Sequence, residues 1–159
     1  MWRSCGIQNE WAPLKTVLLH CPGEELHQVA DPDQAQMVAS LDASRAERQH
    51  NCMAQAFRDA GVTVQYLAPD RTPPPNLMFV ADLMFMTPEG AVLGRPASSV
   101  RAGEERYVAR TLADLGIPIL RTVRGRGTFE GADAAWLDRQ TVLLAQGLRT
   151  NAVGATQVA

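Results

Sequence analysis

A repeated pattern of helix, glycine and strand constrains the fold of this chain more than any single motif. A helical pattern ends at Gly61 and again at Gly116, and a strand-like run follows each glycine. A hairpin that carries an acidic residue comes next in both cases, at Asp82 and at Asp133. Repetition at roughly fifty residues is typical of stacked or radial arrays, in which each unit buries its apolar face against the next. The pattern therefore predicts an α/β array of one repeated unit.

Local signals predict the individual elements of this array. Gly61 is expected to end its helix in a left-handed conformation, and Gly116 to end the second one. The proline-rich run 69–75 can continue neither a helix nor a strand. Apolar periodicity predicts helices at 33–60, with a break in its polar middle, at 102–115, and from 152 onwards. Strands are predicted at 16–20, 62–67, 76–86, 91–95, 119–123, 129–137 and 141–145.

Composition bounds the class of protein. With 159 residues, of which 46% are hydrophobic and 20% charged, the chain is expected to form one globular domain, residues 1–159. The net charge is −2 and the basic residues are dispersed, which argues against a nucleic-acid partner. No run approaches the roughly 20 apolar residues of a membrane span, and residues 1–9 lack a secretory pattern. Three widely spaced cysteines, Cys5, Cys21 and Cys52, favour a reducing compartment, so a cytoplasmic location is predicted.

Two stretches place acidic residues in apolar surroundings. Asp82 ends the run that starts at Asn76, and Glu130 and Asp133 follow Phe129. Burying an ionised carboxylate costs several kcal/mol unless a cation or hydrogen-bond donors meet it. If these side chains share one pocket, they suit a compact cation such as a guanidinium. The alternative for Asp82 is that it caps a turn or pairs with a structural arginine.

The spacing of three between Glu130 and Asp133 adds a condition. In a regular strand it would direct the two side chains to opposite faces, so Gly131 is expected to mark a bulge.

Two arginines, Arg101 and Arg149, each follow a hairpin. Arginine binds carboxylates through two parallel hydrogen bonds, so together with the acids they describe a zwitterionic ligand that has a guanidinium at one end and a carboxylate at the other. The alternative is that both are solvated surface arginines.

Other candidates fail on geometry. His20 and Cys21 are adjacent in a predicted strand, so their side chains diverge and do not form a nucleophile and base pair. His27, His50 and Cys52 lack metal-ligand spacing, and the glycines of 125–131 lack the spacing and the helix of a dinucleotide loop. We therefore expect neither a metal nor a cofactor.

Four motifs together resemble one known family. They are Asn76-Leu77-x-Phe79-x-x-Asp82, Arg101 followed by Glu104, Phe129-Glu130-Gly131-Ala132-Asp133, and Gly147-x-Arg149-Thr150. In order and spacing they resemble the guanidine-modifying superfamily of arginine deiminases, dimethylarginine dimethylaminohydrolases and amidinotransferases, the pentein fold. The resemblance implies an incomplete α/β propeller of ββαβ units, about three of five, and covers nearly the whole chain.

The resemblance also implies roles for these residues. Asp82 and Glu130 would be catalytic: Asp82 would bind the guanidinium nitrogens, and Glu130 would hold the guanidinium and assist proton transfer. Substrate binding would involve Asn76, Phe79, Asp82, Arg101, Asp133 and Arg149, with Asn76 and the two arginines at the amino-acid end. Ala81 stands where the family usually has Arg, and Ala132 where Gly is common, which leaves the exact substrate open.

The implied reaction is hydrolysis of a guanidino amino acid to citrulline through a Cys-amidino intermediate. The catalytic His and Cys of the family belong to later units, and none of the three cysteines of this chain matches the nucleophile position. We therefore expect a fragment, a truncated product or half of a split enzyme, with a homo-oligomer or a complementary C-terminal half as its partner. An amidinotransferase and a non-catalytic module that binds a guanidino ligand or assists assembly are the alternatives.

Overall fold

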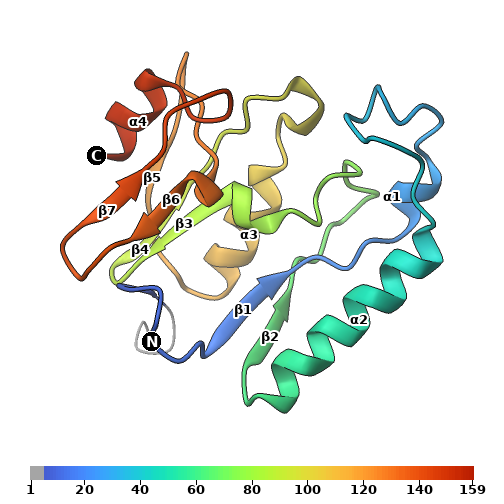
Figure 1. Ribbon diagram of the computed structural model, residues 1–159, viewed down its shortest axis with the longest axis horizontal. Coiled ribbons are helices and arrows are strands. Elements are labelled where there is room, and N and C mark those ends of the chain that lie inside the picture. The colour runs from blue at the N-terminus through green and yellow to red at the C-terminus, as the bar shows by residue number, and fades with distance from the viewer. Residues whose placement is uncertain (1–5) are drawn as a thin grey trace. The chain divides into compact units, whose positions relative to one another are not determined.

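The computed structural model describes residues 6–159, which fall into two compact units (Figure 1). The first unit is Leu14–Val80, and the second is Ala81–Ala159 together with residues 6–13. The prediction of a single domain stays a prediction.

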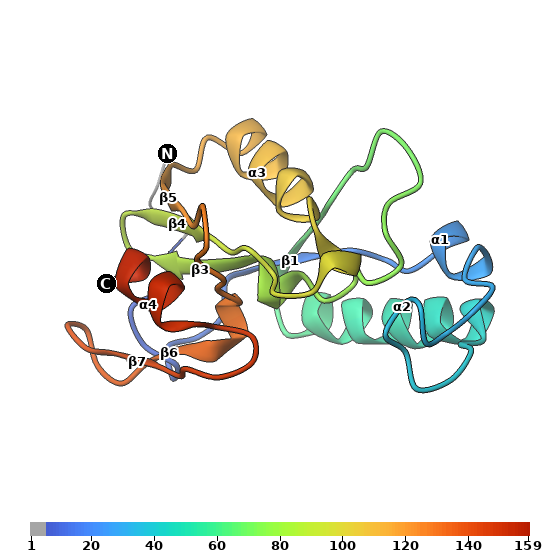
Figure 2. The same ribbon diagram turned by 90° about the horizontal axis from the view of Figure 1, so that it is seen from above.

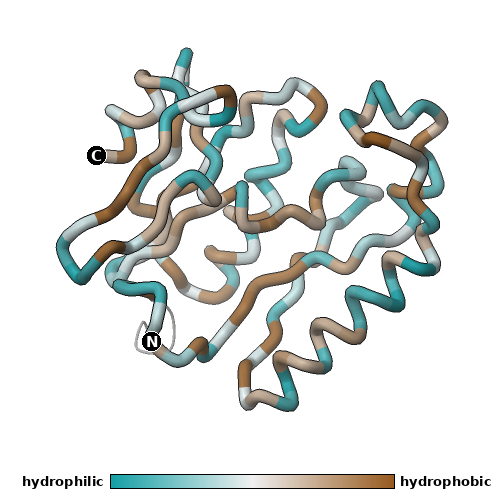
Figure 3. Tube along the Cα trace, viewed as in Figure 1, coloured by the Kyte–Doolittle hydropathy of each residue, from teal (hydrophilic) through white to brown (hydrophobic). Residues whose placement is uncertain are grey.

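The first unit is built on two parallel strands. Strand β1 (Thr16–Leu19) pairs with β2 (Thr63–Tyr66), and helices α1 (Glu24–His27) and α2 (Ala43–Asp59) lie between them in the sequence. Helix α2 packs against β2 and carries mainly hydrophilic residues, whereas the three residues of β1 that follow Thr16 are hydrophobic (Figure 3). The predicted strands at 16–20 and 62–67 are thus confirmed.

Helix α2 begins and ends as local chemistry requires. The side chain of Asp42 accepts a hydrogen bond of 2.9 Å from the backbone N–H of Arg45, which satisfies one of the free donors of the first turn. At the other end Gly61 has φ +78°, and the N–H of Val62 bonds to the carbonyl of Phe57 at 2.9 Å. This is a Schellman ending, which a glycine adopts without strain. The predicted role of Gly61 is confirmed.

The first half of the predicted helix 33–60 is wrong. Residues 33–42 form turns, and Gln36 has φ +57°. Two apolar residues of this stretch, Val38 and Leu41, are exposed. A helical nucleus is unfavourable unless tertiary packing supports it, and these apolar residues have no such support.

The second unit contains a three-stranded sheet. The 3-10 turn η2 (Val80–Leu83) begins at the end of the first unit and leads into β3 (Met84–Thr87), which forms a hairpin with β4 (Gly90–Leu93). The 3-10 turn η3 (Ser99–Arg101) and helix α3 (Glu105–Asp114) follow, and β5 (Ile119–Thr122) then pairs parallel to β4. These elements form a ββαβ unit, and α3 ends at Gly116 in the same Schellman geometry as α2.

A second hairpin completes this unit. The 3-10 turn η4 (Gly131–Asp133) leads into β6 (Ala134–Trp136), which pairs with β7 (Val142–Leu144), and α4 (Ala152–Val158) follows as predicted. Figure 2 shows α3 on one side of the three-stranded sheet and the β6–β7 hairpin on the other. The core between sheet and hairpin contains the buried residues Phe85, Val92, Val123 and Phe129, with Trp136 stacked on Phe85 at 5.6 Å between ring centroids.

The α/β class is therefore confirmed. Within residues 6–159 the sheets contain two, three and two strands. None of the helices in this range has the length and apolar character needed to span a bilayer.

Candidate functional site

Both acidic motifs lie in 3-10 turns, where strands were predicted. Asp82 is in η2, directly before β3, and Glu130 caps η4, directly before β6. The prediction of a strand is therefore wrong at 76–82 and at 130–133, whereas Phe129 forms an isolated antiparallel bridge with Arg95. In a 3-10 turn residues three apart lie on the same side, which resolves the spacing of Glu130 and Asp133 without the predicted bulge.

Gly131 is required at the start of η4 for another reason. A Cβ at this position would collide with the backbone oxygens of Met84 and Ala81. The backbone of η4 thus lies directly against the backbone at the start of β3, and only glycine permits this approach. Both turns are held together by main-chain packing.

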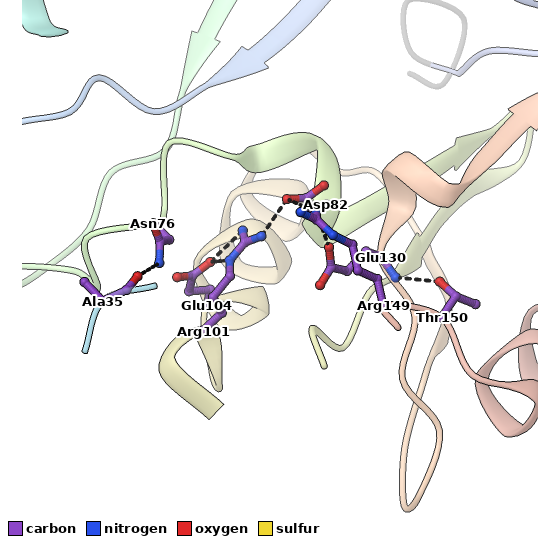
Figure 4. A network of polar contacts seen from close by, with 8 residues as sticks. All are labelled: Ala35, Asn76, Asp82, Arg101, Glu104, Glu130, Arg149 and Thr150. Carbon is purple, nitrogen blue, oxygen red and sulfur yellow. Dashed lines mark hydrogen bonds and ion pairs between the residues drawn. The ribbon is translucent and has the colours of Figure 1, made fainter. Parts of the chain in front are cut away.

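Asp82, Arg101 and Glu104 form a buried chain of ionic contacts (Figure 4). Nη1 of Arg101 donates to Oδ2 of Asp82 at 2.5 Å. Nε and Nη2 of Arg101 both reach Oε2 of Glu104 at 2.9 Å. Arg101 lies at the end of η3 and Glu104 directly precedes α3, so two short elements supply both partners. The alternative of a solvated surface residue is wrong for Arg101, whose side chain is 8% exposed.

Burial and the ionic contacts act in opposite directions on the charged groups of this chain of contacts. Burial raises the pKa of Glu104 from 4.5 to about 7, against the opposing hydrogen bond and charge of Arg101. Burial alone would lower the pKa of Arg101, but the hydrogen bonds and charges of Glu104 and Asp82 outweigh it, so that this pKa is raised. Arg101 is therefore a permanent buried cation, whereas Glu104 is a carboxyl group that titrates near neutral pH.

A second arginine contacts both predicted catalytic acids. Nη1 of Arg149 donates to Oε2 of Glu130 at 2.8 Å and lies 3.8 Å from Oδ2 of Asp82. Oδ2 of Asp82 thus forms ion pairs with the guanidinium groups of both Arg101 and Arg149. The two acids are buried, but the side chain of Arg149 is 61% exposed. Arg149 therefore links the buried acids to the surface.

Asp133 and Thr150 fix the position of Glu130. The hydroxyl of Thr150 donates to Oδ2 of Asp133 at 2.6 Å and accepts from the backbone N–H of Glu130 at 3.2 Å. Thr150 is fully buried. In this structure Asp133 supports the neighbouring backbone, and its predicted contact with a substrate stays a prediction.

Asn76 and Phe79 belong to the first unit. The side-chain amide of Asn76 is buried and donates to the carbonyl of Ala35 at 2.9 Å. The side chain of Phe79 is about half exposed. Their predicted contacts with a substrate stay predictions.

The sequence patterns gave no role for Glu104 or Thr150, although both residues belong to the four family motifs. The signal for Glu104 was its position three residues after Arg101, the distance at which side chains on one turn meet. The signal for Thr150 was weaker, because nothing in the sequence around a threonine that follows an arginine indicates a hydrogen bond to an acid far away in the chain.

The histidines and cysteines of the first unit do not form an active nucleophile. Nε2 of His20 lies 3.2 Å from Oε1 of Glu25, and burial lowers the pKa of His20. Burial and the charges of Glu47 and Glu25 raise the pKa of the Cys21 thiol, which disfavours the reactive thiolate. Cys5 lies outside the described residues. Among residues 6–159, no cluster of His, Cys, Asp and Glu has the geometry of a metal site.

The arrangement can bind guanidinium groups. Asp82 and Glu130 provide carboxylate oxygens that are already in contact with guanidinium nitrogens of Arg101 and Arg149. Ionic hydrogen bonds of this kind are short and directional, and an arginine fork matches a carboxylate in shape.

Comparison with known proteins gives relatives in both sequence and structure. The chain is 28% identical over 117 residues to N(G),N(G)-dimethylarginine dimethylaminohydrolase of Pseudomonas aeruginosa, which covers 74% of this chain and 45% of that protein. It is 40% identical over 68 residues to arginine deiminase of Clostridium perfringens, which covers 41% of this chain and 16% of that protein. No protein-family model matches the chain.

A solved structure extends this similarity. The dimethylarginine dimethylaminohydrolase of Pseudomonas aeruginosa, in a variant complexed with citrulline, matches 91% of this chain and 55% of its own at a TM-score of 0.76 and 25% identity. The chain thus spans about half the length of that structure and 45% of the first sequence relative. Both comparisons confirm the resemblance to this family. In sequence and in fold, this chain is therefore similar to members of the guanidine-modifying, or pentein, superfamily.

Proposed function

We propose that this chain is the guanidino-binding part of an amidine hydrolase that acts on a guanidino amino acid and releases citrulline, of the arginine deiminase or dimethylargininase type. One observation carries the proposal: the buried acids Asp82 and Glu130 both contact the guanidinium of Arg149, at 3.8 and 2.8 Å. Acids that bind a guanidinium of the protein itself are complementary to the guanidinium of a ligand. The names of the relatives support the same substrate class.

Each charged residue has a role in this proposal. Asp82 binds the guanidinium nitrogens of the ligand, and Glu130 holds the guanidinium and moves a proton. Arg149 gives up its contacts with the acids and turns to the carboxylate of the ligand, which its exposed side chain allows. A contact of Arg101 with this carboxylate stays a prediction, because in this structure its guanidinium is held by Asp82 and Glu104. The proposed ligand contacts of Asn76, Phe79 and Asp133 depend on their sequence motifs.

The proposed reaction proceeds through a covalent intermediate. A Cys thiolate attacks the guanidinium carbon and forms a C–S bond, and the amine leaves with a proton supplied by a His and Glu130. Water then attacks the same carbon, breaks the C–S bond, and releases citrulline and the thiolate. We place the Cys and His outside these 159 residues, in further units of a pentein-type α/β propeller. This chain would be a single domain of about three of its five units. The cytoplasmic location stays a prediction.

Calorimetry with L-arginine tests the binding step. We expect the 159-residue chain to bind L-arginine, and Asp82→Asn to weaken the affinity by about tenfold or more because it removes one ionic partner. Asp138→Asn is the matched control, since Asp138 is an exposed acid of the same unit whose carboxylate caps the turn at Gln140. No binding, or equal binding by the Asp82→Asn variant, would contradict the proposal.

Citrulline release tests the hydrolysis. We expect none from this chain alone, and release when the units that supply Cys and His are joined to it. Glu130→Gln should then lower turnover by about a hundredfold or more. Arginine binding without citrulline release in the joined form would instead support a non-catalytic binding module.

A further inference from the structure

Glu104 is a buried acid that the proposed reaction does not use directly. It is fully buried at the start of α3, and within residues 6–159 its side chain is bound by Arg101, at Oε2. The second oxygen, Oε1, is buried without a hydrogen-bond partner among the described residues. A buried carboxylate with one oxygen unsatisfied destabilises a protein, so packing alone does not account for an acid at this position.

The contact with Arg101 fixes the orientation of the guanidinium. Glu104 engages Nε and Nη2, which is the side edge of the guanidinium plane. This leaves Nη1 directed at Oδ2 of Asp82, at 2.5 Å. Rotation of the plane would break at least one of these contacts, because the fork of an arginine is rigid. Glu104 therefore determines how Arg101 approaches Asp82.

The charge of Glu104 affects Asp82 as well. Arg101 brings a full positive charge next to the carboxylate that the proposed ligand must bind. With Glu104 ionised, the group of Asp82, Arg101 and Glu104 carries a net negative charge, which attracts a guanidinium. With Glu104 neutral, the same group carries no net charge, and Asp82 is already compensated by Arg101. At short range in a buried site this difference is strong.

We propose that Glu104 is a positioning residue for the guanidinium site: it orients Arg101 and balances its charge, so that Asp82 remains available to a ligand guanidinium. This inference builds on the proposed function and adds a residue and a pH dependence to it. The pKa of Glu104, raised to about 7 mainly by burial, agrees with it. The other charged groups that act on Glu104 are Arg101, Asp82 and Glu105.

The first experiment measures L-arginine affinity by calorimetry at several pH values. For the natural chain we expect the affinity to rise between about pH 5 and about pH 9 as Glu104 ionises. Glu104→Gln should bind about tenfold more weakly at the upper pH and should lose this rise. Asp114→Asn, which removes an exposed acid from the last turn of the same helix, is the matched control and should behave like the natural chain. Unchanged affinity of a folded Glu104→Gln variant at the upper pH would overturn the inference.

A second measurement needs no ligand. The side-chain Nε–H of Arg101 donates to Glu104, so its ¹⁵N and ¹H shifts should follow the ionisation of Glu104 in an NMR titration. A purely structural acid that stays in one ionisation state would leave these shifts flat, and a flat titration would overturn the inference. In Glu104→Gln the titration should vanish.

The two measurements separate the two proposals. If the natural chain binds no L-arginine at any pH, the proposed function fails. The Arg101 titration then decides alone whether Glu104 positions Arg101: a shift that follows its ionisation supports this, and a flat one refutes it. If the chain binds L-arginine but Glu104→Gln binds equally well, the proposed function stands and the role of Glu104 is refuted.

Discussion

Glu104→Gln should change how the stability of this protein depends on pH. The carboxyl of Glu104 is fully buried, and burial raises its pKa from 4.5 to about 7 in the folded state. Between these two values the folded state binds the proton of Glu104 more tightly than the unfolded state does. Stability therefore falls as pH rises through this window, and the loss is complete above about pH 7.

The size of the effect follows from the pKa. A pKa raised from 4.5 to about 7 corresponds to about 3 kcal/mol of lost stability, because a tenfold change in the proton equilibrium is worth about 1.4 kcal/mol. Gln has the same shape and does not titrate. The difference in unfolding free energy between the Glu104→Gln variant and the natural chain should therefore change by about 2 to 3 kcal/mol between about pH 5 and about pH 8, in the direction that favours the variant.

Urea denaturation measures this difference. Trp136 lies in the same unit as Glu104 and stacks on Phe85, so tryptophan fluorescence can follow its unfolding. Urea is preferred to guanidinium chloride, since guanidinium would compete for Asp82. Asp114→Asn is the control for the loss of one acid. Parallel pH curves for the natural chain and Glu104→Gln would refute the reasoning, because they would show that Glu104 does not titrate in this window.

Two further predictions concern other parts of the structure. Gly131→Ala should lower the unfolding free energy by about 1 to 3 kcal/mol or more, because its Cβ would collide with backbone oxygens of Met84 and Ala81. Thermal melting measures this loss, and Gly147→Ala is the control, since a Cβ at Gly147 meets nothing within 4 Å. Equal melting temperatures of the two variants would contradict the close approach at Gly131. Glu25→Gln should lower the pKa of His20 further, since the charge of Glu25 now opposes the lowering by burial; an NMR titration of His20 that shows a higher pKa would contradict this.

The sequence predicted the parts of the fold that have strong local signals. Gly61 and Gly116 end their helices as expected, because a left-handed residue after a helix favours glycine. Both hairpins and the strands after the helices also agree with the prediction. These features depend on a few neighbouring residues, which a single sequence shows directly.

The predictions failed where the structure depends on distant packing. The 3-10 turns that carry Asp82 and Glu130 are too short to have a period of their own, so their apolar neighbours were interpreted as strands. The contacts at the candidate site also join separate motifs: Arg101 and Arg149 converge on Asp82 from other elements. The sequence indicated the acids and arginines of the candidate site. It did not show which acid each arginine would contact, or that Glu104 would be fully buried.

The close approach of η4 to the start of β3 has a consequence for how this site can vary. Because Gly131 packs against the main chain of Ala81 and Met84, the distance between the two acid-bearing turns is set by backbone atoms, which every sequence shares. Side chains around the turns can then be exchanged without moving Asp82 relative to Glu130. Ala81 and Ala132, the two positions at which this chain departs from the usual family pattern, are both such neighbours. Ligand preference can thus diverge among related chains while the spacing of the acids stays constant.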